Sequence, residues 1–228
     1  MNNKGYFQFS VSEEQISYAL QLARHSIENH PIRDIYAEDK RDTYGLSADE
    51  RSLRYRFTGT LGEVLFADVY NQPRPSRAFG AIDGQDSGQD FQFNVNGKNV
   101  ILDIKTMNRN NSILYDYYVL DLPAYQIEKN YLTDAYFHIT LIPCDRINFS
   151  GFEAAFVGFI YKNDIPILGT LFSEGSLRPN NRGRSVLFSR ATYEIKLCDL
   201  LSPPIPADVV ELRNFQIMTI KVGQRRPF

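Results

Sequence analysis

Two acids and a lysine stand in one short stretch of alternating apolar and polar residues, GQDFQFNVNGKNVILDIKT. The stretch is typical of two strands joined by Asn96-Gly97, a dipeptide that favours a two-residue type I′ turn because both central positions need positive φ. Such a turn fixes the register, and counting outward from it sets Asp90 opposite Asp103. Strand side chains return to the same face every second residue, so Lys105 lies beside Asp103. The sequence therefore predicts that two carboxylates and one ammonium group converge on this hairpin.

The same register sorts the hairpin residues onto two faces. The apolar face, which is expected to cover the core, collects Phe91, Phe93, Val95, Val100, Leu102 and Ile104. The polar face collects Asp90, Gln92, Asn94, Ile101, Asp103 and Lys105. Directly opposed residues have β-carbons about 5 Å apart, and two carboxylates at that separation repel by about 3 kcal/mol at an effective dielectric of about 20. A positive charge is therefore needed between them.

Either Lys105 or a divalent ion can supply this charge. With Lys105 alone, the group is a solvated ion pair on a strand face, worth under about 1 kcal/mol. A divalent ion neutralises both carboxylates more completely, and magnesium accepts carboxylate oxygens, a backbone carbonyl and several waters. Of three acid-x-Lys patterns, only the one at Asp103 shares a hairpin with a further acid, which favours the metal site there. The other two patterns are Glu38-Lys40 and Glu194-Lys196.

Helical patterns precede the hairpin and must help to position it. Residues 12–29 form an amphipathic helix pattern that opens on a capping box at Ser12. The apolar stripe of this pattern consists of Ile16, Leu20, Ala23 and Ile27. A second helical tract starts near Ser47 and resumes over 60–70, where GTLGEVLFADVY is apolar almost throughout. Glu63 is the acid inside that run.

Aromatic and β-branched residues predict the strands of the chain. These strands are expected at 91–95, 100–105, 135–142, 154–161, 192–197 and 215–222. Together with helical signals at 123–131, they predict an α/β domain that spans 1–228, with a central mixed sheet flanked by helices and additional C-terminal strands. The stretch 163–189 is expected to hold a short helix and a long loop.

With these residues placed, the hairpin and the helix before it resemble the PD-(D/E)XK superfamily of restriction-endonuclease-like nucleases. In that family an acid opens the second core strand, an acid-x-Lys motif lies on the third, and a glutamate often comes from the preceding helix. Asp90, Asp103 with Lys105, and Glu63 match these positions, and DSGQDF followed by NGKNVILDIKT is similar to the family's sequence pattern. Gln89 stands where many members have proline. The resemblance covers residues 59–106.

The resemblance implies a restriction-endonuclease-like core at about 47–161 and a magnesium-dependent endodeoxyribonuclease, of a restriction or defence type rather than a repair or recombination type. Asp90, Asp103 and the backbone carbonyl of Ile104 would hold Mg²⁺, for which Mn²⁺ substitutes. Glu63 would orient a water or complete a second metal site, and Lys105 would position the attacking water. A homodimer that cuts both strands of double-stranded DNA is the assembly that the resemblance suggests.

Basic and amide side chains are the candidates for contacting DNA, because phosphate contacts supply most of the affinity and Asn and Arg pair with base edges. The acid-free stretch SLRPNNRGRSVLFSR, within the expected recognition elements at 162–228, supplies most of them. The candidate residues are Arg109, Arg178, Asn180, Asn181, Arg182, Arg184 and Arg190. For this stretch, a solubilising surface loop is the alternative interpretation.

Composition excludes several other functions. The 228 residues carry a formal net charge of -2, so the chain is not a general polyanion binder and must contact nucleic acid through local basic patches. Cys144 and Cys198 have no close Cys or His partner in sequence, which indicates neither a disulfide scaffold nor a zinc site. Without a long apolar run or a signal-peptide pattern, we expect a cytoplasmic protein that does not contact membranes.

Alternatives to a DNA nuclease stay open. A catalytically silent nuclease-fold protein would bind nucleic acid or a partner without cutting, and a carboxylate-based hydrolase of another substrate would use Asp90 and Asp103 as acid and base without metal. RNA is a further candidate substrate. For Glu63 the alternative is an ordinary salt bridge, and His138, in an apolar strand, is expected to be a hydrogen-bonded core residue.

Overall fold

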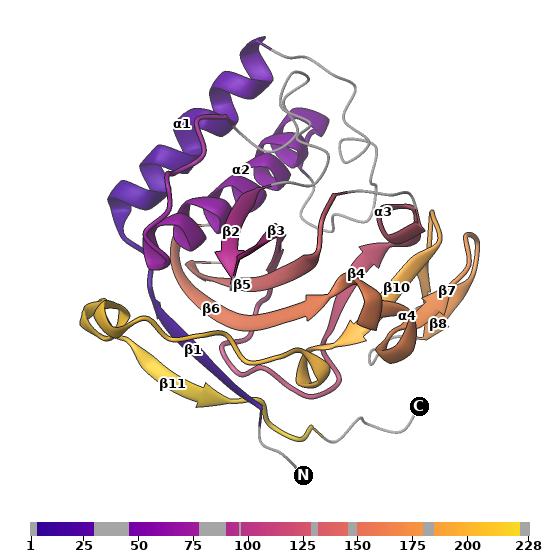
Figure 1. The fold of residues 1–228 in the computed structure, drawn as a ribbon. Coiled ribbons are helices and arrows are strands. Elements are labelled where there is room, and N and C mark those ends of the chain that lie inside the picture. The colour runs from indigo at the N-terminus through magenta and orange to yellow at the C-terminus, as the bar shows by residue number, and fades with distance from the viewer. Residues whose placement is uncertain are drawn as a thin grey trace.

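A six-stranded mixed sheet runs through the centre of the molecule (Figure 1). The computed structural model describes residues 4–29, 46–77, 90–95, 97–128, 132–145, 150–179 and 185–223. In spatial order the strands are β11 (Gln216–Thr219), β1 (Gly5–Ser10), β6 (Ser150–Tyr161), β5 (Ala135–Asp145), β3 (Lys98–Asn108) and β2 (Phe91–Val95). β3 and β5 run parallel, and the other neighbouring pairs are antiparallel. The predicted mixed α/β class with a central mixed sheet is confirmed.

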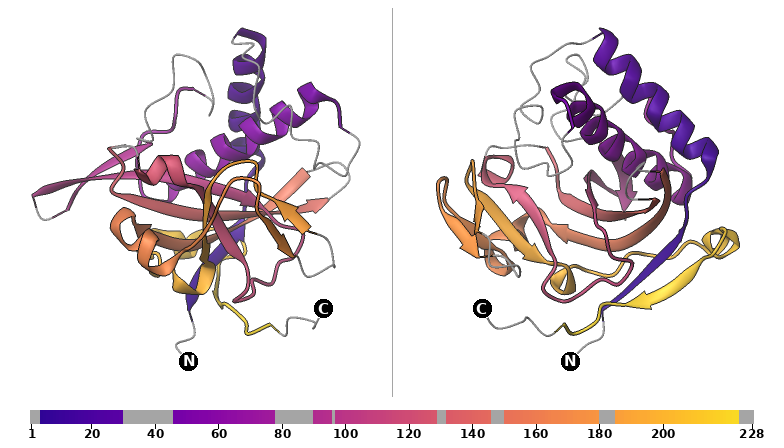
Figure 2. Two further views of the ribbon diagram at one scale, coloured as in Figure 1. Left: turned by 90° about the vertical axis from the view of Figure 1, so that its right-hand side faces the viewer. Right: turned by 180° about the vertical axis from the view of Figure 1, so that it is seen from behind.

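Two long helices, α1 (Glu13–Asn29) and α2 (Ala48–Val69), cover one face of this sheet (Figures 1 and 2). α1 begins at the predicted capping box of Ser12, and α2 begins at a capping box of Ser47, where the start of a helix was predicted. α2 is one continuous helix rather than the two tracts that the sequence indicated. Neither helix, nor any other that the structure describes, is long and apolar enough to cross a membrane.

The buried stripe of α1 differs from the predicted one. The residues of α1 that are buried are Gln15, Ala19, Ala23 and Ser26, most of them small. This side faces α2, where Ser26 accepts a hydrogen bond from the guanidinium of Arg56. Ile16 and Leu20 are only partly buried and line a hollow of about 830 Å³. Close packing against α2 therefore decides which side of α1 is buried, and hydrophobic periodicity does not report such packing.

α2 packs on β3 through a glycine. A β-carbon built on Gly62 would lie 1.8 Å from the side-chain oxygen of Thr106, so a larger residue does not fit without movement. One turn before, Thr58 accepts a hydrogen bond from the Asn108 amide at 2.7 Å. One turn after, the Phe66 ring lies 4.8 Å from the Phe91 ring. The helix thus runs along β3 in the opposite direction and covers the apolar face of the β2–β3 hairpin, as predicted.

The other face of the central sheet is covered mainly by a second sheet (Figure 2). Its strands are β4 (Val119–Pro123), β10 (Thr192–Lys196) and β7 (Thr170–Phe172). Short helices α3 (Ala124–Glu128) and α4 (Ile165–Leu168) flank it, and 3-10 turns lie at Lys162–Asp164, Leu197–Asp199 and Ala207–Glu211. A two-stranded sheet, β8 (Leu177–Pro179) with β9 (Ser185–Leu187), completes the described elements. The molecule is thus layered as helix, sheet and smaller sheet.

The predicted strands are all present, with some changes of length, whereas β1, β4 and β7 to β9 were not predicted. β1 inserts between β6 and β11, so the first and last described strands lie side by side in the central sheet. β11 therefore completes the sheet that carries the candidate site. The predicted short helix in 163–189 is α4.

Candidate active site

The hairpin has the predicted register from Phe91 to Val95, whereas the predicted pairing of Asp90 with Asp103 lies beyond the paired residues. Phe91 pairs with Leu102 and Phe93 with Val100, and the pairing ends at Val95 and Lys98. Gly97 has φ +78°, the positive value that a type I′ turn needs; Asn96 lies outside the described residues. At the other end the backbone N–H of Asp90 donates to the carbonyl of Leu102 at 3.1 Å. Among the described residues, Asp90 thus extends the contact with β3 one residue beyond Phe91, where β2 begins.

The carboxylate of Asp90 caps this edge. Its Oδ2 accepts a hydrogen bond from the backbone N–H of Ile104 at 2.6 Å. Since Leu102 directs its carbonyl toward β2, and residues two apart on a strand direct their backbone groups the same way, the N–H and C=O of Ile104 face the same edge. The Asp90 side chain thus extends the hydrogen bonding with β3 beyond Phe91, the first residue of β2. The carbonyl predicted as a metal ligand lies on the same side of β3 as this carboxylate.

Asp103 and Lys105 lie on the face turned away from α2. Lys105 Nζ donates to Asp103 Oδ2 at 2.7 Å and lies 5.6 Å from the centre of the Tyr136 ring. Asp103 is only 6% exposed, so the pair is not the solvated ion pair that formed the alternative interpretation. Burying two charges costs desolvation energy that their attraction repays only in part. This cost makes the pair a poor device for stability alone.

Glu63 comes from the opposite face of the sheet. It directly follows Gly62 on α2 and is half-buried. Asp103 lies on the other face, which is turned away from α2. Among the described residues, no three His, Cys, Asp or Glu side chains form a group that could hold a metal ion. Within the described part of the chain, Glu63 therefore does not join Asp90 and Asp103 in one group, and the two acids with the Ile104 carbonyl stay the predicted donor set.

This donor set fits a hard cation. Magnesium takes oxygen ligands, is commonly bound by one or two carboxylates, and keeps several waters. Asp90, Asp103 and the Ile104 carbonyl supply oxygen only, and all three come from the base of one hairpin, just beyond the paired residues Phe91 and Leu102. Neither cysteine is nearby in sequence, so a soft metal has no thiolate to bind there.

His138 supports the strand behind Lys105. It is fully buried, its Nδ1 lies 3.0 Å from the Lys105 carbonyl oxygen, and its Nε2 lies 3.0 Å from Thr140 Oγ1. A carbonyl only accepts, so Nδ1 carries the proton and Nε2 accepts from the threonine hydroxyl. Burial, with a smaller contribution from the charge of Arg109, lowers the pKa of His138 to about 3. The prediction of a hydrogen-bonded core histidine is confirmed.

Three of the residues predicted to contact DNA are described, and two of these have partners within the chain. The Arg109 guanidinium donates to the Val119 carbonyl at 2.6 Å and lies 4.4 Å from the centre of the Tyr118 ring. Arg178 on β8 approaches Glu194 on β10, with 2.8 Å between Nε and Oε1. Arg190 is half-buried just before β10. Asn180, Asn181, Arg182 and Arg184 lie outside the described residues.

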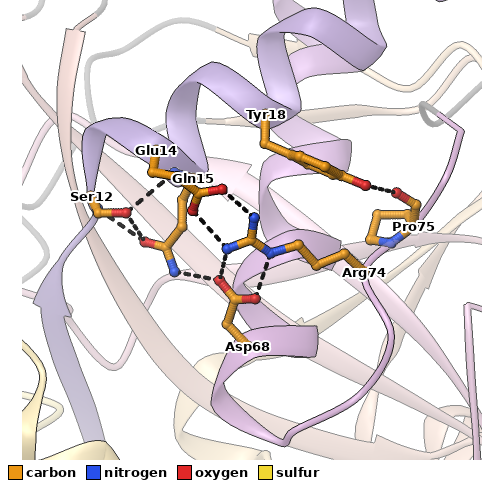
Figure 3. A network of polar contacts seen from close by, with 7 residues as sticks. All are labelled: Ser12, Glu14, Gln15, Tyr18, Asp68, Arg74 and Pro75. Carbon is orange, nitrogen blue, oxygen red and sulfur yellow. Dashed lines mark hydrogen bonds and ion pairs between the residues drawn. The ribbon is translucent and has the colours of Figure 1, made fainter.

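A polar network fixes the segment that follows α2 (Figure 3). Arg74 donates to Glu14 on α1 at 2.5 and 2.8 Å, and to Asp68 on α2 at 2.6 and 2.8 Å. Tyr18 donates from its hydroxyl to the Pro75 carbonyl at 3.0 Å. The chain that leaves α2 toward the hairpin is therefore tied to both helices. Sequence reasoning missed this network, because Glu14 and Arg74 are far apart in the chain.

The chain was compared with protein-family models, with curated proteins and with solved structures, and none of them matches it.

Proposed function

We propose that the protein is a magnesium-dependent endodeoxyribonuclease with a restriction-endonuclease-like core, of a restriction or defence type. The observation that carries the proposal is the edge of the β2–β3 hairpin, where Asp90 and the Ile104 carbonyl share one side of β3 and the buried Asp103 stands beside Lys105.

In this proposal Asp90, Asp103 and the Ile104 carbonyl hold the ion, which is Mg²⁺ or Mn²⁺ in its place. When bound, a divalent ion offsets charge on the scissile phosphate and makes a water more acidic. Asp90 is preorganised for the task because the Ile104 N–H fixes one of its oxygens. Ile104 itself is buried against the helix layer, which keeps its backbone in place.

Lys105 positions the water that attacks the phosphate, and its positive charge stabilises the negative charge that develops on this water. Its ammonium group is held between Asp103 and the Tyr136 ring. Because Asp103 contacts Lys105 directly, one carboxylate would serve both the ion and the lysine. Glu63, half-buried on α2, orients the water from the other face of the sheet or completes a second metal position.

A specific observation also favours a second candidate. Both acids already have partners within the chain, Asp90 in the Ile104 N–H and Asp103 in Lys105. Such a hairpin is also compatible with a catalytically silent nuclease-fold protein that binds nucleic acid without cutting it. The two candidates differ in one outcome, the appearance of cut strands.

The test is cleavage of supercoiled plasmid, linear duplex DNA and RNA, each with Mg²⁺, with Mn²⁺ and with a chelator. Asp103→Asn and Lys105→Ala should each lower the cleavage rate by at least 100-fold, on the order of what loss of metal or water positioning costs. Lys196→Ala is the matched control, because this exposed lysine ends another acid-x-Lys pattern on a strand. Circular dichroism shows whether each variant is folded.

Metal-dependent cutting by the wild type and the control, lost in the two site variants, supports the nuclease. Binding without cutting under every metal condition supports the silent protein instead. Cleavage that survives the chelator contradicts both and favours a metal-independent hydrolase. A homodimer that cuts both strands stays a prediction, which sedimentation of the protein with and without DNA tests.

A further inference from the structure

The β2–β3 hairpin extends beyond the body of the protein (Figure 2, left view). Near its base the apolar face is anchored to the helix layer, where the Phe66 ring meets Phe91 at 4.8 Å and Phe93 at 5.9 Å. Toward the tip, Asn94, Lys98 and Asn99 are exposed. The hairpin is therefore a two-stranded ribbon with a fixed base and a polar, solvated end.

One face of this ribbon carries amides and continues the candidate active site. Asn94 pairs with Asn99 across the strands, and Gln92 pairs with Ile101. Directly opposed residues share a face, and residues two apart on one strand share it too. Gln92, Asn94 and Asn99 therefore stand on the face that carries Asp103.

The amides on this face are available for a partner. Gln92, Asn94 and Asn99 are all exposed, and neither Gln92 nor Asn99 makes a side-chain hydrogen bond within the part of the chain that the structure describes. Asn94 uses its Oδ1 to accept from the Gly97 N–H at 3.0 Å, which leaves its amide donor outward. The sequence between Asp90 and Asp103 contains no acid and one base, Lys98. This combination fits a polyanion whose surface presents both donors and acceptors.

We propose that this ribbon enters the major groove of duplex DNA and that Asn94, Asn99 and Gln92 read base edges there. The proposal rests on the nuclease function proposed above. The major groove, about 12 Å wide, admits a two-stranded ribbon, and Asn or Gln pairs bidentately with adenine. Ile101, between Asn99 and Asp103 on the same face, offers an apolar contact for a thymine methyl group.

The length of the ribbon also sets the distance between the base pairs that it contacts and the scissile phosphate. Asn99 stands four residues before Asp103, which is about 13 Å along an extended strand. Duplex DNA rises about 34 Å in each turn of about 10 base pairs. If the ribbon lies along the groove, the base pairs that Asn99 contacts are about four base pairs from the scissile phosphate.

The experiment selects duplexes from a library of randomised sequence, by cutting with Mg²⁺ and separately by binding without metal. Asn99→Ala and Gln92→Ala remove an amide each. Asn94→Asp keeps the acceptor for the Gly97 N–H, so it preserves the turn while setting a negative charge toward the DNA. Asn163→Ala, an exposed asparagine after β6, is the matched control. Thermal unfolding confirms that each variant is folded.

We expect the wild type and Asn163→Ala to prefer particular bases at about four base pairs from the cut. Asn99→Ala and Gln92→Ala should each lower that preference by roughly 5- to 150-fold, the discrimination of one bidentate pair. Asn94→Asp should weaken duplex binding at least tenfold. An RNA duplex of matched sequence should bind more weakly, because its major groove is too narrow for side chains.

Unchanged preference and affinity in the three ribbon variants would overturn the inference while leaving the nuclease intact. Equal or tighter binding of the RNA duplex would overturn it as well. If the wild type binds duplex DNA without cutting it, the nuclease proposal is wrong. The binding selection would then still test whether the ribbon contacts the bases. A wild type that neither binds nor cuts would contradict both.

Discussion

Acidification should destabilise the protein through His138, and the expected size follows from the structure. The group is fully buried and its pKa is lowered from 6.5 to about 3, chiefly by burial. A lowered pKa means that the unfolded chain takes up a proton that the folded chain refuses, so stability is complete above about pH 6.5 and falls as the pH drops toward 3. At pH 5 the pH is about 1.5 units below the ordinary histidine pKa of the unfolded chain. The free energy of unfolding therefore falls by about 2 kcal/mol, at about 1.36 kcal/mol per unit.

The assay is urea unfolding of the wild type and His138→Gln at pH 7.5 and pH 5. Glutamine can donate to the Lys105 carbonyl and accept from Thr140, as the histidine does, but it does not titrate in this range. Every other ionisable group is shared, so the difference between the two pH dependences isolates His138. We expect the wild type to lose about 2 kcal/mol more than the variant. Equal losses would refute the assignment of a buried neutral histidine.

Three further outcomes are expected. Lys4 is buried, with its pKa lowered to about 8 by burial, so Lys4→Met should raise the unfolding free energy at pH 7 by up to about 3 kcal/mol. That gain should fade as the pH rises from 8 to 10.5, and an unchanged urea midpoint at pH 7 would contradict it. Gly62→Ala should lower the free energy of unfolding by about 1–3 kcal/mol, because the added methyl group pushes α2 away from β3. Adding Thr106→Ala should restore part of this stability. Unchanged stability of the single variant would contradict the contact. Arg74→Met should lower stability by about 1 kcal/mol. This loss should shrink in high salt and at acid pH, as Glu14, whose pKa Arg74 lowers, takes up its proton. A salt-independent loss in urea titrations would count against the ion pairs.

Features set by neighbouring residues in the chain could be predicted from the sequence. The hairpin register followed from the Asn96-Gly97 turn, because a two-residue loop leaves only one pairing for the flanking strands. The starts of both long helices followed from capping boxes at Ser12 and Ser47, which act over three residues. The pairing of Asp103 with Lys105 followed from the period of a strand.

Features set by tertiary packing could not be predicted. The buried side of α1 was decided by its contact with α2, and the strand β1 gained its place from neighbours at the far end of the chain. Arg178 was expected to contact DNA because it belongs to the acid-free stretch 176–190, yet Glu194 approaches it from β10. The hydrogen bond from the Ile104 N–H to Asp90 joins a side chain just before β2 to the backbone of β3, a contact that the alternating pattern does not report.

The account depends most on the claim that Asp90 and Asp103 hold one divalent ion together. Electron paramagnetic resonance of Mn²⁺ measures this directly in the wild type, Asp90→Asn, Asp103→Asn and the double variant, with Asp208→Asn, an exposed acid on a 3-10 turn, as control. Asparagine at position 90 keeps an oxygen for the Ile104 N–H, so the hairpin edge is preserved. We predict that each single variant loses at least tenfold in affinity and that the double variant loses little more than the weaker single, because both ligate the same ion. Wild-type Mn²⁺ affinity in either single variant would contradict the shared site.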